Sequence, residues 1–206
     1  MKKLIGLTAF ARSGKDTFYN FASVSLDGSG SCATRMAFAD VLKKECDSLT
    51  LPYAGISSFT TVPREKELIR PLLVAYGTHL RRRLNPNCWI DKIKTAVNQS
   101  LKKGGYVFIT DVRFENEAQW IKSEGGVLVR IVRQGVGAAN PDEEEQSPLI
   151  CPLVDFSVEW PTYGAKNVYK CAPRVSSAMS RIEKIFQRSR ASQWTIDERE
   201  SSAKVH

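Results

Sequence analysis

The feature that most restricts the fold of this chain is an apolar run that leads directly into a tight turn containing glycine and lysine. Residues Leu4–Thr8 are almost continuously apolar, as expected of a strand covered on both faces of a parallel sheet. The turn Ala9–Thr17 (AFARSGKDT) follows, and apolar residues then recur at helical spacing up to Leu26. A strand, a turn and a helix in this order predict an α/β fold with a mostly parallel sheet.

The remaining chain alternates between apolar runs and segments with helical periodicity. Strands are expected at 33–39, 106–111, 127–132 and 155–160, and helices at 40–49 (with Asp40 as N-cap), 65–84, 89–101, 115–123 and 176–188. The polar segment 135–148 is expected to be irregular, and residues 191–206 to form a polar, mobile tail. A length of 206 residues suits one domain, which we expect to span residues 1–190.

Composition excludes several classes of protein. No apolar run approaches the ~20 residues that a membrane-spanning helix needs. The five cysteines are odd in number and contain no C-x-x-C pair, and the two histidines are too few for a histidine metal site. We therefore expect reduced thiols and a cytoplasmic location. The net charge of +8 indicates an anionic ligand, either a phosphorylated metabolite or nucleic acid.

The turn after the first strand resembles a phosphate-binding loop. The P-loop pattern is G-x-x-x-x-G-K-[ST], in which backbone N–H groups surround phosphates and the lysine reaches the β and γ oxygens. Here Ala9 replaces the first glycine, and Asp16 stands at the hydroxyl position with Thr17 next to it. We expect a P-loop NTPase-type three-layer αβα fold with a lid-like insertion. The residues expected to bind ATP are Arg12, Ser13, Gly14, Lys15, Asp16 and Thr17.

A carboxylate at the end of a second strand predicts a magnesium site. The strand 106–111 finishes at Asp111, and P-loop enzymes hold the metal's water shell with an acidic residue at such a strand end. Asp16, Thr17 and Asp111 are the expected Mg²⁺-binding residues, because Mg²⁺ prefers oxygen ligands. The alternative for Asp111 is that it caps the helix that follows.

Arginines supply the positive charge that phosphoryl transfer needs. Arg130 and Arg133 bracket the end of a strand, just before the segment at about 133–153 where we expect a lid, and Arg113 follows Asp111. Lys15, Arg130, Arg133 and Asp111 are the expected catalytic residues. Arg70 and the run Arg81–Arg83 lie in the middle third, where one arginine is expected to bind the substrate phosphate.

Several motifs together resemble the bacteriophage deoxynucleoside monophosphate kinases. They are R-S-G-K-D-T at 12–17, Y-G-T at 76–78, Trp89, T-D-V-R-F-E-N-E-A at 110–118, G-G at 125–126 and V-R at 132–133. The similarity runs in order through the first two thirds of the chain. Three family features are absent: a glycine at the position of Ala9, an Arg-Pro pair, where this chain has Arg133-Gln134, and a histidine in the acidic segment 142–145.

The resemblance implies an ATP- and Mg²⁺-dependent kinase that phosphorylates a deoxynucleoside monophosphate (dNMP). It places the substrate in a helical region at about 40–100. The residues that it implies near the substrate are Asp40, Thr78, Trp89, Arg113, Asn116 and Glu117. We expect the dNMP as partner, with neither a membrane nor nucleic acid; pairing of two chains stays open.

Three alternatives are kept. The first is another small-molecule P-loop kinase, acting on a coenzyme precursor or a phosphorylated alcohol. The second is a basic nucleic-acid-binding protein with a non-catalytic P-loop, for which aromatic residues lie among basic ones at Arg81–Trp89. The third is an interaction protein with an inactive P-loop.

Overall fold

All strands of the sheet are parallel, so their carboxyl ends lie along the same edge. The computed structural model describes the chain from residue 2 to residue 203, and the side chains from residue 2 to residue 191. The strands are β1 (Lys3–Thr8), β2 (Ala33–Met36), β3 (Tyr106–Val112), β4 (Val127–Arg133) and β5 (Phe156–Trp160), in the order β2-β3-β1-β4-β5. Each adjacent pair is parallel.

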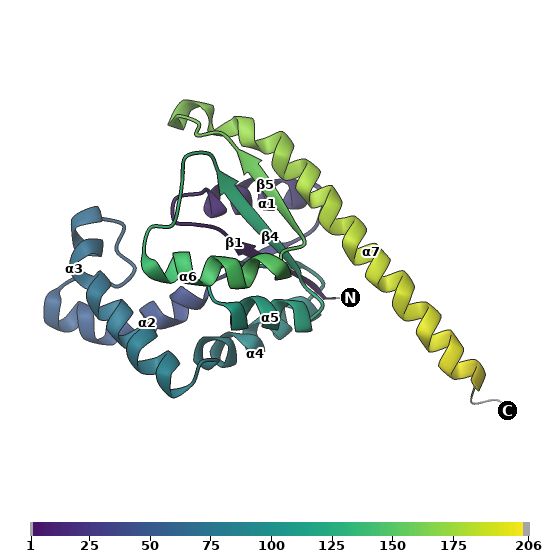
Figure 1. Ribbon diagram of the computed structural model, residues 1–206, viewed down its shortest axis with the longest axis horizontal. Helices are drawn as coiled ribbons and strands as arrows, with labels where there is room; N and C mark the ends of the chain where they lie inside the picture. Colours follow the sequence, from purple (N-terminus) through teal and green to yellow (C-terminus); the bar gives the residue numbers. More distant parts are fainter. Residues whose placement is uncertain (1, 204–206) are drawn as a thin grey trace.

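Helices cover both faces of the sheet and confirm the predicted three-layer αβα fold. On one face α1 (Lys15–Gly28) and α7 (Ala172–Ala203) pack over a core that includes Phe18 and Phe108. On the other face α4 (Cys88–Lys102) and α5 (Glu115–Ser123) pack over a second core that includes Ile109. Figure 1 shows the two helical layers, with α7 crossing one side and extending beyond the sheet.

The middle of the chain forms a helical region beside β2 and β3. It consists of α2 (Phe38–Ala54), α3 (Pro63–Val74) and a π-helix, η1 (Ala75–Arg82). The helix predicted at 40–49 therefore begins earlier and ends later, and Asp40 lies in its first turn, while the N-cap is Ala37. The helix predicted at 65–84 changes from α to π geometry after Val74, at the Y-G-T motif.

A partly buried network of polar side chains holds this helical region together. The Glu45 carboxylate accepts hydrogen bonds from Tyr76 Oη at 2.8 Å and from Arg81 Nη1 at 2.7 Å, and it pairs with Lys92. A Cβ atom on Gly77 would lie 2.8 Å from a methyl group of Leu42, so the π-helix packs so closely against α2 that a larger residue would require the Leu42 side chain to shift. These contacts join α2, η1 and α4.

Two segments predicted as irregular are helical. Within the polar segment 135–148 the chain forms α6 (Pro141–Ile150), followed by the 3-10 turn η2 (Cys151–Leu153). A second 3-10 segment, η3 (Ala165–Cys171), precedes α7, and α7 continues to Ala203, through residues predicted as a polar tail. Among the described residues, no helix combines the length and apolar character that crossing a membrane requires.

Candidate phosphate-binding site

The turn between β1 and α1 has the backbone conformation of an anion-binding loop. Gly14, the N-cap of α1, has φ of 95°, and Arg12 has φ of 66°. For a residue other than glycine the left-handed region costs about 1–2 kcal/mol, so surrounding contacts must hold Arg12 there. None of the described side chains caps the amino terminus of α1, so its first N–H groups stay available to an anion.

Lys15 lies inside this loop as a half-buried cation. Its Nζ atom donates a hydrogen bond to the Ala9 carbonyl oxygen at 3.3 Å. Burial and the nearby charge of Arg113 lower the pKa of Lys15 below its ordinary value, although carboxylates nearby, Asp111 among them, oppose the shift. An anion bound here would favour the charged ammonium, so the loop attracts phosphate through Lys15 as well as through its backbone.

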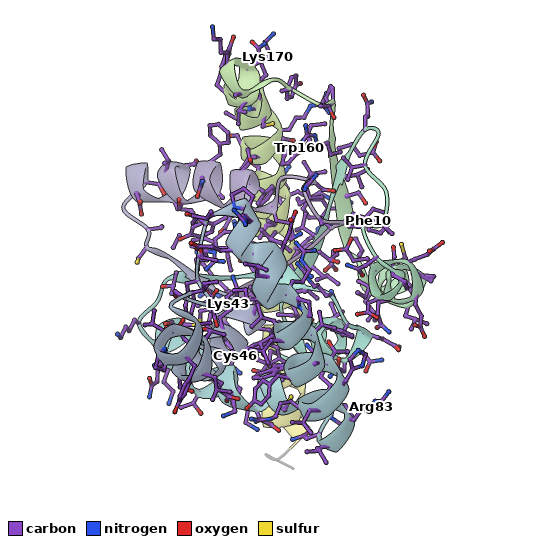
Figure 2. All side chains as sticks on the ribbon, turned by 90° about the vertical axis from the view of Figure 1, so that its left-hand side faces the viewer. Phe10, Lys43, Cys46, Arg83, Trp160 and Lys170 are labelled. Atoms are coloured by element: carbon purple, nitrogen blue, oxygen red, sulfur yellow. The ribbon has the colours of Figure 1, made fainter. Side chains whose placement is uncertain are left out.

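Trp160, at the end of β5, packs against the backbone of the phosphate loop. Its indole Nε1 donates a hydrogen bond to the Ser13 carbonyl oxygen at 3.0 Å, and the ring is 3% exposed. A Cβ atom on Gly14 would lie 2.9 Å from Trp160 Cζ2. Figure 2, viewed from the side of α2 and α3, shows Trp160 and Phe10 above Lys43 and Cys46 of α2. Sequence analysis missed Trp160, since 147 residues separate it from Ser13.

Arg133 explains how Arg12 keeps its left-handed backbone. The guanidinium of Arg133 donates a hydrogen bond from Nη1 to the Arg12 carbonyl oxygen at 3.1 Å and another from Nε to Thr162 Oγ1 at 2.9 Å. Thr162 in turn donates to the Gln134 carbonyl oxygen at 2.9 Å. The strand end that carries Arg133 is thus tied to the phosphate loop.

A pocket lies beside the loop at the carboxyl edge of the sheet. Arg130 is fixed in its wall, where Nη2 donates to Ser147 Oγ at 3.1 Å and Nη1 donates to the Cys151 sulfur. The exposed side chain of Arg113 donates no hydrogen bond to any residue that the structure describes, which leaves its guanidinium available to a ligand. The pocket is lined by Thr8, Ala9, Phe10, Val112, Arg113, Arg130, Glu143, Ser147 and Ile150.

Glu143 connects α6 to the phosphate loop. Its Oε2 atom accepts hydrogen bonds from the backbone N–H groups of Ala11 and Ala139, each at 3.1 Å. The Asn140 side chain caps α6 by accepting from Glu143 N at 2.9 Å. Asn at the N-cap, Pro next and Glu three residues on is a helix-start signal, and it could have revealed both α6 and the position of Glu143.

Asp111 lies at the expected edge, but it contacts the start of α2, a contact that sequence analysis did not predict. β3 pairs with β1, so Asp111 ends beside the phosphate loop, and its charge acts on Lys15. Its Oδ1 and Oδ2 atoms accept hydrogen bonds from Phe38 N at 2.9 Å and Ala39 N at 2.8 Å. The carboxylate therefore caps α2, and not the following helix α5; burial raises its pKa, while these two N–H groups and Arg113 oppose the rise.

Two residues of the 110–118 motif hold structure together and do not face the pocket. Glu117 is 1% exposed, accepts hydrogen bonds from the backbone N–H groups of Arg113 and Phe114, and pairs with Arg82. Burial raises the pKa of Glu117, and the Arg82 charge opposes this rise. Asn116 Nδ2 donates to the Pro86 carbonyl oxygen at 2.9 Å, which ties α5 to the loop before α4.

The other residues expected near the substrate are dispersed. Trp89 is 2% exposed within the core under α4, so its expected place against a substrate is wrong; its large apolar ring packs where β3 needs cover. Asp40 pairs with Arg35 Nη1 at 2.8 Å on the surface. Arg70 is exposed on α3, and Thr78 is half-buried in η1.

Few of the described side chains are available to bind metal at the expected magnesium site. Among residues 2–191 no three His, Cys, Asp or Glu side chains come together as a metal cluster. Asp16 and Thr17 lie in the first turn of α1, where a hydroxyl and a carboxylate suit a metal that is held mainly by phosphate oxygens and water. In addition, the buried Thr110 Oγ1 has no hydrogen-bond partner among the described residues, so the adjacent strand also offers an unused oxygen. These side chains fit Mg²⁺ bound together with a nucleotide.

Comparison with known proteins identifies the family. No family model matches the chain. A protein of Acanthamoeba polyphaga mimivirus, named "Putative deoxynucleotide monophosphate kinase", is 32% identical over 161 residues, which are 69% of this chain and 81% of the viral protein. The chain belongs to this nucleotide kinase family. The uncharacterized protein ORF77 of Ictalurid herpesvirus 1 (strain Auburn) is 37% identical over 92 residues, covering 44% of the nucleotide kinase described here and 40% of ORF77.

The positive charge of the site can be compared with the ligands that a nucleotide kinase binds. A nucleotide kinase must bind two phosphorylated molecules side by side at one edge of its sheet. In this nucleotide kinase the loop at 9–17 offers backbone N–H groups and Lys15, and the adjoining pocket offers the guanidinium groups of Arg113 and Arg130. The loop and the pocket thus place two groups of positively charged residues next to each other.

Proposed function

We propose that the protein transfers the γ-phosphoryl group of ATP to a deoxynucleoside monophosphate, giving ADP and a deoxynucleoside diphosphate. The observation that supports this most strongly is the loop at 9–17, where a half-buried Lys15 with a lowered pKa lies at an uncapped helix start. The name of the mimivirus relative supports the choice of acceptor. We assign the triphosphate to this loop and the acceptor phosphate to the pocket lined by Arg113.

The reaction needs positioning and charge neutralisation more than acid–base chemistry. An acceptor phosphate oxygen attacks the γ-phosphorus, and the bond from that phosphorus to the β–γ bridging oxygen breaks, so its electron pair leaves with ADP. The acceptor is already ionised near neutral pH, so no general base is required. Lys15 is placed to neutralise charge on the β and γ oxygens, as P-loop lysines do.

The arginines have separate tasks in this proposal. Arg113, which has no side-chain partner among the described residues, receives the acceptor phosphate through its two-pronged guanidinium. Arg133 keeps the loop backbone in place through its hydrogen bond to the Arg12 carbonyl oxygen. Bound magnesium would neutralise phosphate charge, held by Asp16 and Thr17 in the first turn of α1.

A nucleotide panel tests the proposal. ADP release is measured with ATP and each of the four common dNMPs, and the product is identified as a diphosphate by its ³¹P spectrum. We expect strong stimulation by at least one dNMP. Lack of stimulation by every dNMP, together with phosphorylation of another small molecule, would assign the site to a different kinase reaction.

The panel is repeated with two lysine variants. Lys15→Ala should lower kcat by several orders of magnitude, on the order of 10³-fold, because it removes charge stabilisation in a partly buried site. Lys103→Ala is the matched control, since Lys103 is exposed at the end of α4, before β3 begins and thus away from the loop. Near-normal kcat in folded Lys15→Ala protein would refute the assignment of the loop.

A further inference from the structure

The last residues of β3 face opposite sides of the sheet. Tyr106 and Phe108 belong to the core that α1 covers, and Val107 and Ile109 belong to the opposite core. Side chains alternate along a regular strand, but β3 has one extra residue between Ile109 and Val112, which belong to the same core. Of the two residues between them Asp111 lies on the side of α2, which leaves Thr110 to continue the row that faces α1. Asp111 turns the other way, toward the start of α2.

The row that ends in Thr110 leads to the phosphate loop. Phe108 packs edge-on against Tyr19 of α1 at 5.5 Å between ring centroids, so the next residue of the row lies nearer to the start of α1. That start is Lys15. On β1, the pairs Gly6–Ile109 and Thr8–Val112 place Thr110 beside Leu7, two residues before the loop begins at Ala9. Thr110 is thus the side chain of β3 that faces the loop.

The hydroxyl of Thr110 is buried and unused. Thr110 is 2% exposed, and its Oγ1 atom has no hydrogen-bond partner among the described residues. An unpaired buried hydroxyl is unfavourable, and native proteins rarely retain such a group without a reason. A ligand in the loop supplies that reason.

We propose that Thr110 is the binding residue through which β3 contacts the magnesium nucleotide in the phosphate loop. Its hydroxyl serves either a phosphate oxygen or a water of the metal, a task that sequence analysis gave to Asp111. The inference rests on the proposed function, since it requires a nucleotide in the loop.

The test compares the stability of the free protein with nucleotide binding. Thr110→Val keeps the shape and removes the hydroxyl, so the free protein should unfold at an unchanged or higher urea concentration, because no hydrogen bond is lost. Its Kd for Mg·ATP, measured by calorimetry, should rise about tenfold, the loss expected for one hydrogen bond to a charged group. Thr110→Ser keeps the hydroxyl and should bind like the wild type.

Thr50→Val is the matched control. Thr50 is also buried, but its Oγ1 atom is paired with Ser58 Oγ at 3.0 Å in the helical region. This variant should lose stability as free protein and keep its affinity for Mg·ATP. The opposite patterns of the two variants separate a hydroxyl kept for a ligand from one kept for the fold.

Each outcome has one meaning. Weaker binding by Thr110→Val with and without magnesium supports contact with phosphate, and weaker binding only with magnesium supports contact with metal-bound water. Equal Kd values for wild type and Thr110→Val, or a loss of stability in free Thr110→Val as large as in Thr50→Val, would overturn this inference alone. A wild-type protein that binds no Mg·ATP would overturn the proposed function as well.

Discussion

The indole of Trp160 lies against the backbone of Gly14, so close that a methyl group there would stand 2.9 Å from the ring. The last strand of the sheet thereby fixes the turn that follows the first strand. Three contacts set the loop's shape: the Trp160 hydrogen bond to Ser13, the Arg133 hydrogen bond to Arg12 and the Glu143 hydrogen bond to Ala11. Residues that are distant in the sequence therefore hold the phosphate loop in its shape before any ligand binds.

Gly14→Ala should lower the free energy of unfolding more than a glycine substitution that only strains the backbone. Gly30→Ala is the control, because Gly30 has a similar positive φ of 74° and open space where a Cβ would stand. We expect Gly30→Ala to cost about 1 kcal/mol in the free energy of urea unfolding. Gly14→Ala should cost about 2 kcal/mol more, because the buried Trp160 ring must shift. Equal losses for the two variants would show that the ring moves freely.

The arginine run 81–83 offers a matched pair of variants. Arg82 pairs with the buried Glu117 and stacks over the Phe114 ring at 3.9 Å, whereas Arg83 is exposed. Removing one partner of a buried ion pair leaves an uncompensated charge, so Arg82→Ala should cost about 3 kcal/mol in unfolding free energy. Arg83→Ala should change it by less than about 0.5 kcal/mol.

Glu117→Gln removes the charge that pairs with Arg82 but keeps a side-chain oxygen that can accept the capping hydrogen bonds. If Arg82→Ala and Glu117→Gln destabilise to a similar degree and the double variant is no worse than either, the two residues act as a pair. Additive losses would contradict the pairing.

Nucleotide binding should depend on pH through Lys15. Its pKa in the folded protein is lowered from 10.5, so the folded state releases this proton at a lower pH than the unfolded state. The Lys15 contribution to stability is therefore present above pH 10.5 and is lost as pH falls through the lowered pKa. A bound triphosphate favours the charged ammonium, so ATP binding should take up protons at alkaline pH, and affinity should fall as pH rises through this pKa. Calorimetry in two buffers of different ionisation heat measures the uptake, which Lys15→Met should abolish.

Glu143→Gln should loosen the contact between α6 and the loop. The carboxylate accepts two backbone hydrogen bonds, and a neutral amide accepts them more weakly. We expect faster hydrogen exchange at the Ala11 and Ala139 amides, with little change in the core strands. Glu144→Gln is the control, because Glu144 is exposed on the same helix. Unchanged exchange in Glu143→Gln would show that the link adds no protection.

Local patterns predicted the sheet and the position of the turn between β1 and α1 well. The apolar runs of β1, β3 and β4 and the R-S-G-K-D-T turn are short-range signals, and the structure has a strand or a turn at each. The alternation of strands and helices was enough to predict the parallel three-layer architecture.

The errors arose where long-range packing decides the role of a residue. Trp89 lies in a motif shared with kinases, but its ring fills the core under α4, and no local pattern separates these two uses of tryptophan. The alternative that Asp111 caps the next helix is wrong, because its carboxylate caps α2, which precedes it by about 70 residues in the chain. Its role in holding metal stays a prediction. The N-cap signal at Asn140 was present but was outweighed by the polarity of the segment.

Asp111 also decides how the two ligands must be recognised. Three helices begin beside the end of β3. The start of α2 is occupied by the Asp111 carboxylate and that of α5 by the side chains of Glu117 and Gln146, whereas α1 is uncapped by any described side chain. Main-chain recognition of an anion is thus reserved for the ligand at α1, the ATP of our proposal, and the acceptor depends on side chains such as Arg113. Since backbone amides survive most substitutions, acceptor preference in this lineage can diverge through a few surface exchanges while donor recognition stays constant.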